Sequence, residues 1–332
     1  YKRVVTSTLN AVPCLKETNV IKVTVNNFCS GSIGTDQTIC EGIAPSPLTS
    51  VTPTGDGVFS YRWFNSADGS AFTLIPGAIS ETYSPGILAA DIWYKREVKS
   101  TLNTISCILE NNIVKVTVNN FLAGSISADQ TICEGGTPSA FTDVAATGDG
   151  TITYLWKDSP DGIVFTDIAV ATGAVYIPGV LTQDTWYKRV VTSTLNGTPC
   201  VKETNMVRVT AINFAPGAIS TDQTICNATA PATFTSVAAS GDGVKTYQWQ
   251  NSPDNITWAT IPGATSATYT AGVLTADTYY RRLVTSTLNG TPCILPTNSI
   301  LVTVNNFLPG SISTDQTICE TDIPAAFSSV IP

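Results

Sequence analysis

The chain has 332 residues, of which 43% are hydrophobic and only 13% charged, and its formal net charge is −8. It contains no histidine, the usual proton shuttle near neutral pH and the commonest metal ligand, so Ser-His-Asp, Cys-His and His-zinc chemistry are excluded within this segment. With 17 Lys plus Arg, it lacks the basic surface that nucleic acid requires. No apolar run approaches the ~18 residues of a membrane helix, so we expect no direct membrane insertion.

The sequence repeats itself at intervals of 93 residues. The segment YKRVVTSTLN at Tyr1 returns, with small changes, at Tyr94, Tyr187 and Tyr280. A strand cut from its sheet leaves unpaired backbone groups, so we expect a longer natural chain on both sides. The period predicts the end of one repeat, three complete repeats and the start of another, over 1–30, 31–123, 124–216, 217–309 and 310–332.

Within one repeat, short strands are separated by turn sequences. Thr-Gly-Asp-Gly at 147–150, Ser-Pro-Asp-Gly at 159–162 and Asn-Gly at 196–197 are typical of turns. No segment keeps a helical period, and a repeat of this length suits a two-sheet sandwich. In chain order, the strands predicted for the second repeat are 125–132, 140–146, 151–157, 164–168, 174–177, 185–193 and 206–212.

Two aromatic positions narrow the fold further. A tryptophan recurs in the third predicted strand, and a tyrosine recurs near the start of the penultimate one, as in immunoglobulin domains. We therefore predict an all-β chain of immunoglobulin-like sandwiches arranged end to end. The expected core residues are Trp63, Trp156, Trp249, Tyr94, Tyr187 and Tyr280.

These segments also carry a family resemblance. GSISADQTICEGGTPSAF, YLWKDSPDG, TWYKRVVTSTLNGTPC and MVRVTAIN resemble the immunoglobulin-like repeats of very large Bacteroidota surface proteins. The resemblance covers effectively the whole chain. It implies an extracellular, structural or adhesive role, with export by the type IX secretion system as in gliding-associated adhesins. It brings no catalytic residues with it.

Eight of the nine cysteines follow the period, and Cys29 does not. Without histidine or a CxxC motif, two periodic cysteines per repeat indicate disulfides rather than zinc, and so an oxidising, extracellular compartment. One set ends the first strand and the other follows the last hairpin turn. The first set is Cys40, Cys133, Cys226 and Cys319, and the second is Cys14, Cys107, Cys200 and Cys293.

The connectivity of these cysteines has two main solutions. Pairing within a repeat would give Cys40–Cys107, Cys133–Cys200 and Cys226–Cys293. In an immunoglobulin-like sandwich, however, those positions lie at opposite poles, roughly 25 Å apart for eight residues at ~3.3 Å each, whereas bridged Cα atoms lie within ~7 Å. Pairing across adjacent repeats would give Cys40–Cys200 and Cys133–Cys293, and free thiols remain a third outcome.

Further periodic residues lie near the repeat boundaries. A phenylalanine at each boundary is expected either to fill the contact between repeats or to cap the core of its own repeat. Asp149 of Gly-Asp-Gly favours a turn, with calcium an unfavoured alternative because one carboxylate is too few. We therefore expect no cofactor. The boundary phenylalanines are Phe28, Phe121, Phe214 and Phe307.

Two further sets of residues are expected on the surface of each repeat. Strand alternation directs one of each basic pair on the penultimate strands, such as Lys95 and Arg96, outward and the other toward a sheet face or strand edge, and we expect both to be solvated. Trp93, Trp186 and Trp258 could bind sugar, although packing on a sheet face is the simpler role.

The sequence therefore predicts a non-enzymatic structural or adhesive segment of an extracellular stalk or filament. The alternatives are an array of carbohydrate- or ligand-binding modules, or the non-catalytic spacer of a large secreted enzyme. The expected partners are further copies of the same repeat in the chain, and lateral self-association through edge strands.

Overall fold

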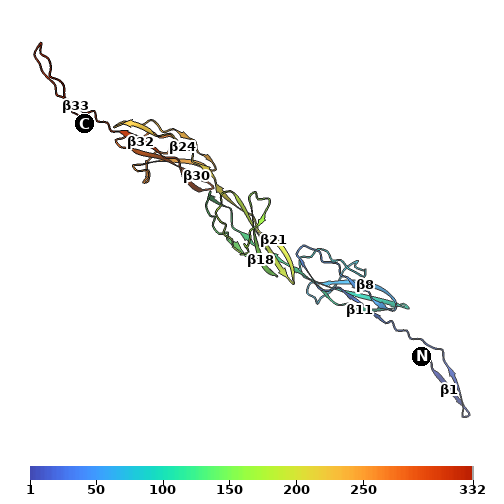
Figure 1. The fold of residues 1–332 in the computed structure, drawn as a ribbon. Helices are drawn as coiled ribbons and strands as arrows, with labels where there is room; N and C mark the ends of the chain where they lie inside the picture. Colours follow the sequence, from blue (N-terminus) through green and yellow to red (C-terminus); the bar gives the residue numbers. More distant parts are fainter. Residues whose placement is uncertain (331–332) are drawn as a thin grey trace. The chain divides into compact units, whose positions relative to one another are not determined.

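The computed structural model describes residues 1–330, and every regular element in that range is a β-strand, which confirms the all-β class (Figure 1). No helix in this range is long and apolar enough to cross a membrane. The chain forms two compact units, which are described separately. Unit 1 contains Tyr1–Ser125, Val144–Leu155 and Arg189–Thr204, and unit 2 contains Ile126–Asp143, Trp156–Lys188 and the described residues from Asn205 onward.

The strands are short apart from two long ones in each repeat. Those of unit 1 are β1 (Val4–Leu9), β2 (Val12–Glu17), β3 (Phe28–Cys29), β4 (Ser32–Ile33), β5 (Gln37–Cys40), β6 (Ser50–Val51), β7 (Thr54–Gly55), β8 (Val58–Ser66), β9 (Thr73–Leu74), β10 (Ile92–Leu102), β11 (Ile105–Glu110), β12 (Val114–Asn119), β13 (Phe121–Leu122), β17 (Thr147–Gly148) and β21 (Thr198–Glu203). Four strands have residues in both units: β14 (Ser125–Ile126), β16 (Asp143–Val144), β18 (Thr151–Ser159) and β20 (Thr185–Leu195). Those of unit 2 are β15 (Gln130–Cys133), β19 (Thr166–Asp167), β22 (Val207–Ile212), β23 (Phe214–Ala215), β24 (Ala218–Ile219), β25 (Gln223–Cys226), β26 (Ser236–Val237), β27 (Ser240–Gly241), β28 (Val244–Ser252), β29 (Ala259–Thr260), β30 (Thr278–Leu288), β31 (Thr291–Pro296), β32 (Ile300–Asn305), β33 (Ser311–Ile312) and β34 (Ser329–Val330).

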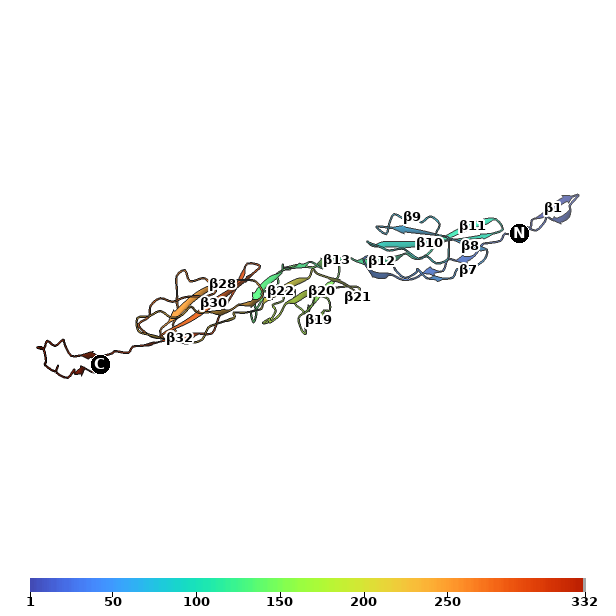
Figure 2. The ribbon, with the colours of Figure 1, turned by 90° about the horizontal axis from the view of Figure 1, so that it is seen from above.

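The first complete repeat lies in unit 1 and has one large sheet. Its strand order is β5-β12-β10-β8-β9, with β11 also paired to β10. Figure 2 labels β8 to β12 of this repeat. β5 runs parallel to β12, and the other pairs are antiparallel. The short pairs β3–β7 and β4–β6 are separate from this sheet. Ile33 of β4 and Trp63 of β8 belong to one buried cluster, so the core lies between the small pairs and the large sheet.

Strict alternation in β10 explains how this core is built. Tyr94, Arg96, Val98 and Ser100 are buried, while the residues between them are more exposed. Successive side chains of a strand point to opposite faces, so one face of β10 is turned entirely inward. Because Val98 and Ser100 sit further along the strand than Tyr94, the same inward face supplies both the centre and one end of the repeat.

Unit 2 contains the complete third repeat, and its strand order is equivalent: β25-β32-β30-β28-β29, with β31 paired to β30. Part of the second repeat also lies in unit 2, where β15 pairs in parallel with β22 and β22 pairs with β20. The hairpin between β20 and β21 lies in unit 1. The parallel pairs β5–β12, β15–β22 and β25–β32 share one register, so the repeats are built alike.

The recurring aromatic residues lie where the sequence places them. Trp63, Trp156 and Trp249 are fully buried, and each indole N–H donates to a backbone carbonyl at 2.8–2.9 Å. The recurring tyrosines, Tyr94, Tyr187 and Tyr280, are each only 3% exposed. Burial raises the pKa of Tyr94 and of Tyr280 to about 12 and raises that of Tyr187 further.

Several predicted strands of the second repeat differ in the structure. The segment 140–146 is a strand only at Asp143–Val144, 164–168 only at Thr166–Asp167, and Thr198–Glu203 forms a strand that was not predicted. The segment 125–132 is interrupted, because Ser125–Ile126 pairs with one partner strand and Gln130–Cys133 with another. Between them Asp129 accepts the backbone N–H of Arg208 at 2.8 Å. The segment 174–177 makes only the single bridge from Tyr176 to Phe141. Pro178 follows it and has no N–H with which to continue a ladder.

Candidate functional site at the repeat junctions

Consecutive repeats follow one another almost without a linker. In unit 1, β12 ends at Asn119 and β13 begins at Phe121; because β13 pairs with β17, it belongs to the next repeat, ahead of the boundary predicted after residue 123. In unit 2, β22 ends at Ile212 and β23 begins at Phe214. We call the contacts around Asn120 the first junction and those around Asn213 the second junction. With one residue between strands, side-chain contacts determine how much freedom each junction has.

A disulfide crosses each junction. Cys40, the last residue of β5, is bonded to Cys200 of β21, with Cα atoms 5.5 Å apart. In unit 2, Cys133 of β15 is bonded to Cys293 of β31, with Cα atoms 5.6 Å apart. Both bonds join residues 160 positions apart, so each connects one repeat to the next. These are the two pairs expected across repeats.

The alternative pairing within a repeat, Cys40–Cys107, Cys133–Cys200 and Cys226–Cys293, does not form. Cys40 pairs with Asn119 of β12, which lies past Ile92, the first residue of β10. Cys107 instead pairs with Ser100, near the other end of β10. Residues of one sheet separated in this way are roughly 25 Å or more apart at ~3.3 Å per residue, far too distant for a disulfide. The free cysteines of the described chain are Cys14, Cys29, Cys107, Cys226 and Cys319.

The hairpin that carries each second cysteine also binds the preceding repeat by hydrogen bonds. Asn196 and Gly197 both have positive φ, of 48° and 79°, as a two-residue type I′ turn requires. From this turn Asn196 donates to the Thr38 hydroxyl at 3.1 Å, and Thr198 donates to the Thr38 carbonyl at 3.4 Å. At the second junction Asn289 and Thr291 bind Thr131 with the same distances.

The boundary phenylalanines lie at the junctions. Phe121 is buried in a cluster that contains Cys40 of the preceding repeat and Val191 and Cys200 of the following one. Phe214 occupies the equivalent place with Cys133 and Cys293. Each ring therefore packs against the disulfide and the end of the next repeat, rather than within the repeat that precedes it. Phe28 is half-buried and Phe307 is exposed.

The Gly-Asp-Gly motif binds the chain at the junction. Asp149 accepts the N–H of Asn120 at 3.2 Å through its carboxylate, and its own N–H donates to the Asn120 carbonyl at 3.0 Å. A Cβ on Gly148 would lie 2.3 Å from the Phe121 Cβ, so only glycine allows this approach. Across residues 1–330, no group of three or more His, Cys, Asp or Glu side chains is placed to hold a metal ion.

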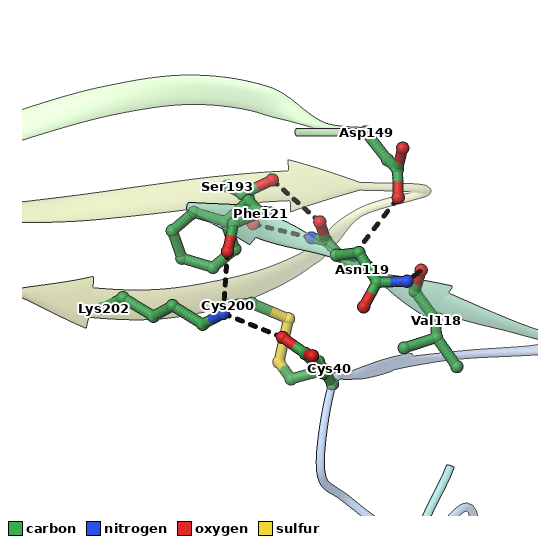
Figure 3. Close-up of polar contacts among 10 residues, drawn as sticks. Cys40, Val118, Asn119, Phe121, Asp149, Ser193, Cys200 and Lys202 are labelled. Atoms are coloured by element: carbon green, nitrogen blue, oxygen red, sulfur yellow. Dashed lines mark hydrogen bonds and ion pairs between the residues drawn. A yellow bond between two sulfur atoms is a disulfide. The ribbon is translucent and has the colours of Figure 1, made fainter. Parts of the chain in front are cut away.

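A buried pair of polar side chains completes the first junction (Figure 3). Asn119 donates to the Ser193 carbonyl at 2.9 Å and accepts from the Ser193 hydroxyl at 2.8 Å, and both residues are buried. Nearby, the Lys202 ammonium donates to Glu41 at 2.9 Å and to the Phe121 carbonyl at 2.7 Å. It also lies 4.9 Å from the Phe121 ring centroid. Sequence reasoning missed these contacts.

The second junction replaces both polar contacts with apolar ones. Ile212 stands in the place of Asn119 and is buried against Phe214, Val284 and Cys293. Leu295 stands in the place of Lys202. A groove of about 370 Å³ remains there, lined by Ile212, Phe214 and Leu295 with the carboxylate-bearing Glu134. Lys245 approaches Phe214 instead, at 5.5 Å from the ring centroid.

One residue of each basic pair was wrongly expected to be solvated. Arg96, Arg189 and Arg282 are fully buried. Arg96 donates to the Asn111 side chain at 2.8 Å, to the Ser50 hydroxyl at 2.7 Å and to backbone carbonyls. Burial lowers the pKa of Arg96 and of Arg282, yet an arginine stays charged in proteins. The alternation of β10 could have predicted this burial, because Arg96 lies on the same face as Tyr94 and Val98.

The tryptophans considered for sugar binding carry cations on their rings. Lys115 lies 4.8 Å from the Trp93 centroid, Arg208 lies 5.0 Å from that of Trp186, and Arg281 lies 4.2 Å from that of Trp258. A cation over a ring occupies the face on which a sugar would stack. These contacts fit packing on the outer face of the sheet.

Comparison with solved structures identifies similar arrays of domains. The three N-terminal domains of the Hoc outer capsid protein of bacteriophage RB49 are 11% identical, cover 84% of this chain and 100% of their own, and give a TM-score of 0.37. Hemolin, an insect immune protein described in connection with homophilic adhesion, is 11% identical, covers 83% and 77%, and gives 0.29. Titin domains A168–A170 are 12% identical, cover 84% and 99%, and give 0.30.

No protein with a curated description matches the sequence. A family model does match, three times, at residues 29–120, 122–213 and 215–306. These three matches cover most of the chain and follow the tandem immunoglobulin-like repeats described above. The chain therefore belongs to the domain family of unknown function DUF8696.

Proposed function

We propose that this chain is a structural or adhesive segment of a long extracellular repeat protein, which forms a stalk or filament on a bacterial surface. The observation that carries the proposal is the disulfide across each junction, Cys40–Cys200 and Cys133–Cys293. A bond between neighbouring repeats, added to a one-residue connection, restricts bending where a flexible linker would permit it. A molecule that must hold its ends apart needs this property, whereas independent binding modules do not.

The chemistry of the junctions supports an extracellular location. Disulfides persist in oxidising compartments, and immunoglobulin-like domains with disulfides are typical of extracellular proteins. The sequence resemblance to Bacteroidota surface repeats adds a more specific proposal, export by the type IX secretion system. The partners that we propose are further repeats of the same chain and, laterally, other copies of it. We propose no cofactor and no enzymatic activity.

Small-angle scattering of the 332-residue chain, oxidised and then reduced, tests the stalk. We expect the oxidised chain to scatter as a stiff rod. The double variant Cys200→Ser/Cys293→Ser should bend more and show a shorter mean end-to-end distance, while Cys29→Ser, which removes an unpaired thiol, should not. Identical scattering from the oxidised chain and the double variant would refute the mechanical role of the disulfides. A specific ligand on a glycan array would instead favour the array of binding modules.

A further inference from the structure

The first junction shows which groups at the end of a repeat bind an ammonium ion. The Lys202 ammonium donates to the Glu41 carboxylate at 2.9 Å and to the Phe121 carbonyl at 2.7 Å (Figure 3). Its nitrogen also lies 4.9 Å from the centroid of the Phe121 ring. A carboxylate, a carbonyl and an aromatic face therefore surround one primary ammonium group.

The second junction keeps these three groups. Glu134 stands 93 residues after Glu41, and Phe214 takes the place of the first junction's phenylalanine. The N–H of Asp242 donates to the Asn213 carbonyl at 2.9 Å, so these two residues form a hydrogen-bonded pair of the ladder between β23 and β27. In an antiparallel ladder the adjacent pair is not hydrogen-bonded, so the carbonyl of Phe214 points away from β27. It can therefore accept a hydrogen bond from outside the ladder.

Within the described chain, no ammonium group joins this carbonyl to Glu134. Leu295 occupies the position of Lys202 and carries no charge. Glu134 forms no ion pair with any described residue. Lys245 approaches the Phe214 ring, but its ammonium donates to the carbonyls of residues 241–243. The second junction therefore has the acceptors of the first junction without the donor.

The groove beside these acceptors has the size and lining that such a donor requires. Its volume of about 370 Å³ lies within the range of small-molecule sites. Ile212, Ile294 and Leu295 supply apolar walls, and Glu134 is the one charged residue of the described lining. One carboxylate and one carbonyl are too few ligands for calcium. A fitting ligand therefore combines a short apolar chain with a positive charge that carries N–H groups.

We propose that the groove of the second junction binds a small primary alkylammonium ion. The ammonium donates to Glu134 and to the Phe214 carbonyl, and the alkyl chain lies along the apolar walls, as the side chain of Lys202 lies at the first junction. An exposed ion pair contributes little and the ligand has few atoms, so we expect millimolar affinity. This inference goes beyond the proposed stalk and does not rest on it, because binding leaves the disulfide intact.

Titration of the oxidised 332-residue chain with n-butylamine tests the site, with NMR of labelled Ile, Leu and Val methyl groups as the readout. This amine has the four carbons and the ammonium of a lysine side chain, and it stays protonated at neutral pH as lysine does. The methyl signals of Ile212 and Leu295 should shift and saturate, whereas those of Val191 at the first junction should not. n-Butanol lacks the charge and tetramethylammonium lacks N–H groups, so both should bind about fivefold more weakly or worse.

Matched variants at the two junctions separate binding from folding. Leu295→Lys supplies the ammonium from within the chain and should abolish the shifts. The first junction already carries lysine at this place, so signals away from the groove should stay unchanged. Glu134→Gln should weaken binding about fivefold, whereas Glu41→Gln should leave binding at the second junction unchanged. Lys202→Leu should open a corresponding site, so that the Val191 methyl signals then respond to n-butylamine.

Three results would overturn the proposal. The first is a set of groove methyl signals that ignore n-butylamine, or that respond equally to n-butanol. The second is equal binding by wild type and Leu295→Lys. The third is binding of a capped lysine amide without binding of n-butylamine, which would assign the groove to the lysine side chain of a protein partner.

Discussion

Replacing Asn119 with alanine tests how far the first junction depends on its buried polar contacts. Asn119 is 1% exposed, and it exchanges two hydrogen bonds, of 2.9 and 2.8 Å, with the equally buried Ser193. The substitution leaves a carbonyl and a hydroxyl group without these partners. An orphaned buried polar group costs about 1–3 kcal/mol. With two such groups, we expect Asn119→Ala to lower the local free energy of opening by about 2–6 kcal/mol.

Hydrogen exchange, read by mass spectrometry on peptides from the first junction, measures this free energy locally. Because 1.4 kcal/mol corresponds to a factor of ten, protection in β13 and the neighbouring end of β20 should fall roughly thirtyfold or more. Asn120→Ala is the matched control. Its side chain makes one long bond of 3.5 Å to the Val118 carbonyl, so its effect should stay within about 0.5 kcal/mol. Equal effects of Asn119→Ala and Asn120→Ala would refute the reasoning.

Three further predictions concern other parts of the chain. Leu295→Lys should bring an ammonium group to Glu134 and raise the stability of the second junction by about 0.2–1 kcal/mol, seen in thermal unfolding at low salt and lost at high salt. Tyr94 and Tyr280 have their pKa raised by burial to about 12, so the stability they contribute is complete below their ordinary pKa of 10.0 and declines as the pH rises through about 12. Urea unfolding across that interval should show the decline, and a flat profile would contradict their burial. Arg96→Met should cost about 3 kcal/mol or more in urea unfolding, because it orphans several buried acceptors, and a neutral result would show that the guanidinium is dispensable.

Much of the fold follows from local patterns in the sequence. The recurrence of Trp156 and Tyr187 at a fixed period identifies an immunoglobulin-like repeat, because each side chain sits on a strand whose alternation is visible. The lengths of the strands then place Cys40 at the end of one repeat and Cys200 at the adjoining end of the next. A strand of known length fixes where its ends are, even when its partner strand is unknown.

The side chains that complete the junctions could not be found in this way. Asn119 and Ser193 are 74 residues apart, and Lys202 and Glu41 are 161 apart. Contacts between residues so far apart in the sequence depend on how one repeat packs against the next. The alternation of residues within single strands does not predict that packing. Arg96 escaped for a different reason, since a charged residue is ordinarily exposed and its burial depends on carbonyl groups supplied by other strands.

Non-reducing peptide mapping of the oxidised chain is the sharpest test of the proposed stalk, because its stiffness depends on which cysteines are joined. We expect digestion without reductant to recover one linked peptide pair containing Cys40 and Cys200, and another containing Cys133 and Cys293. Recovery of a linked pair containing Cys133 and Cys200 would contradict this pairing.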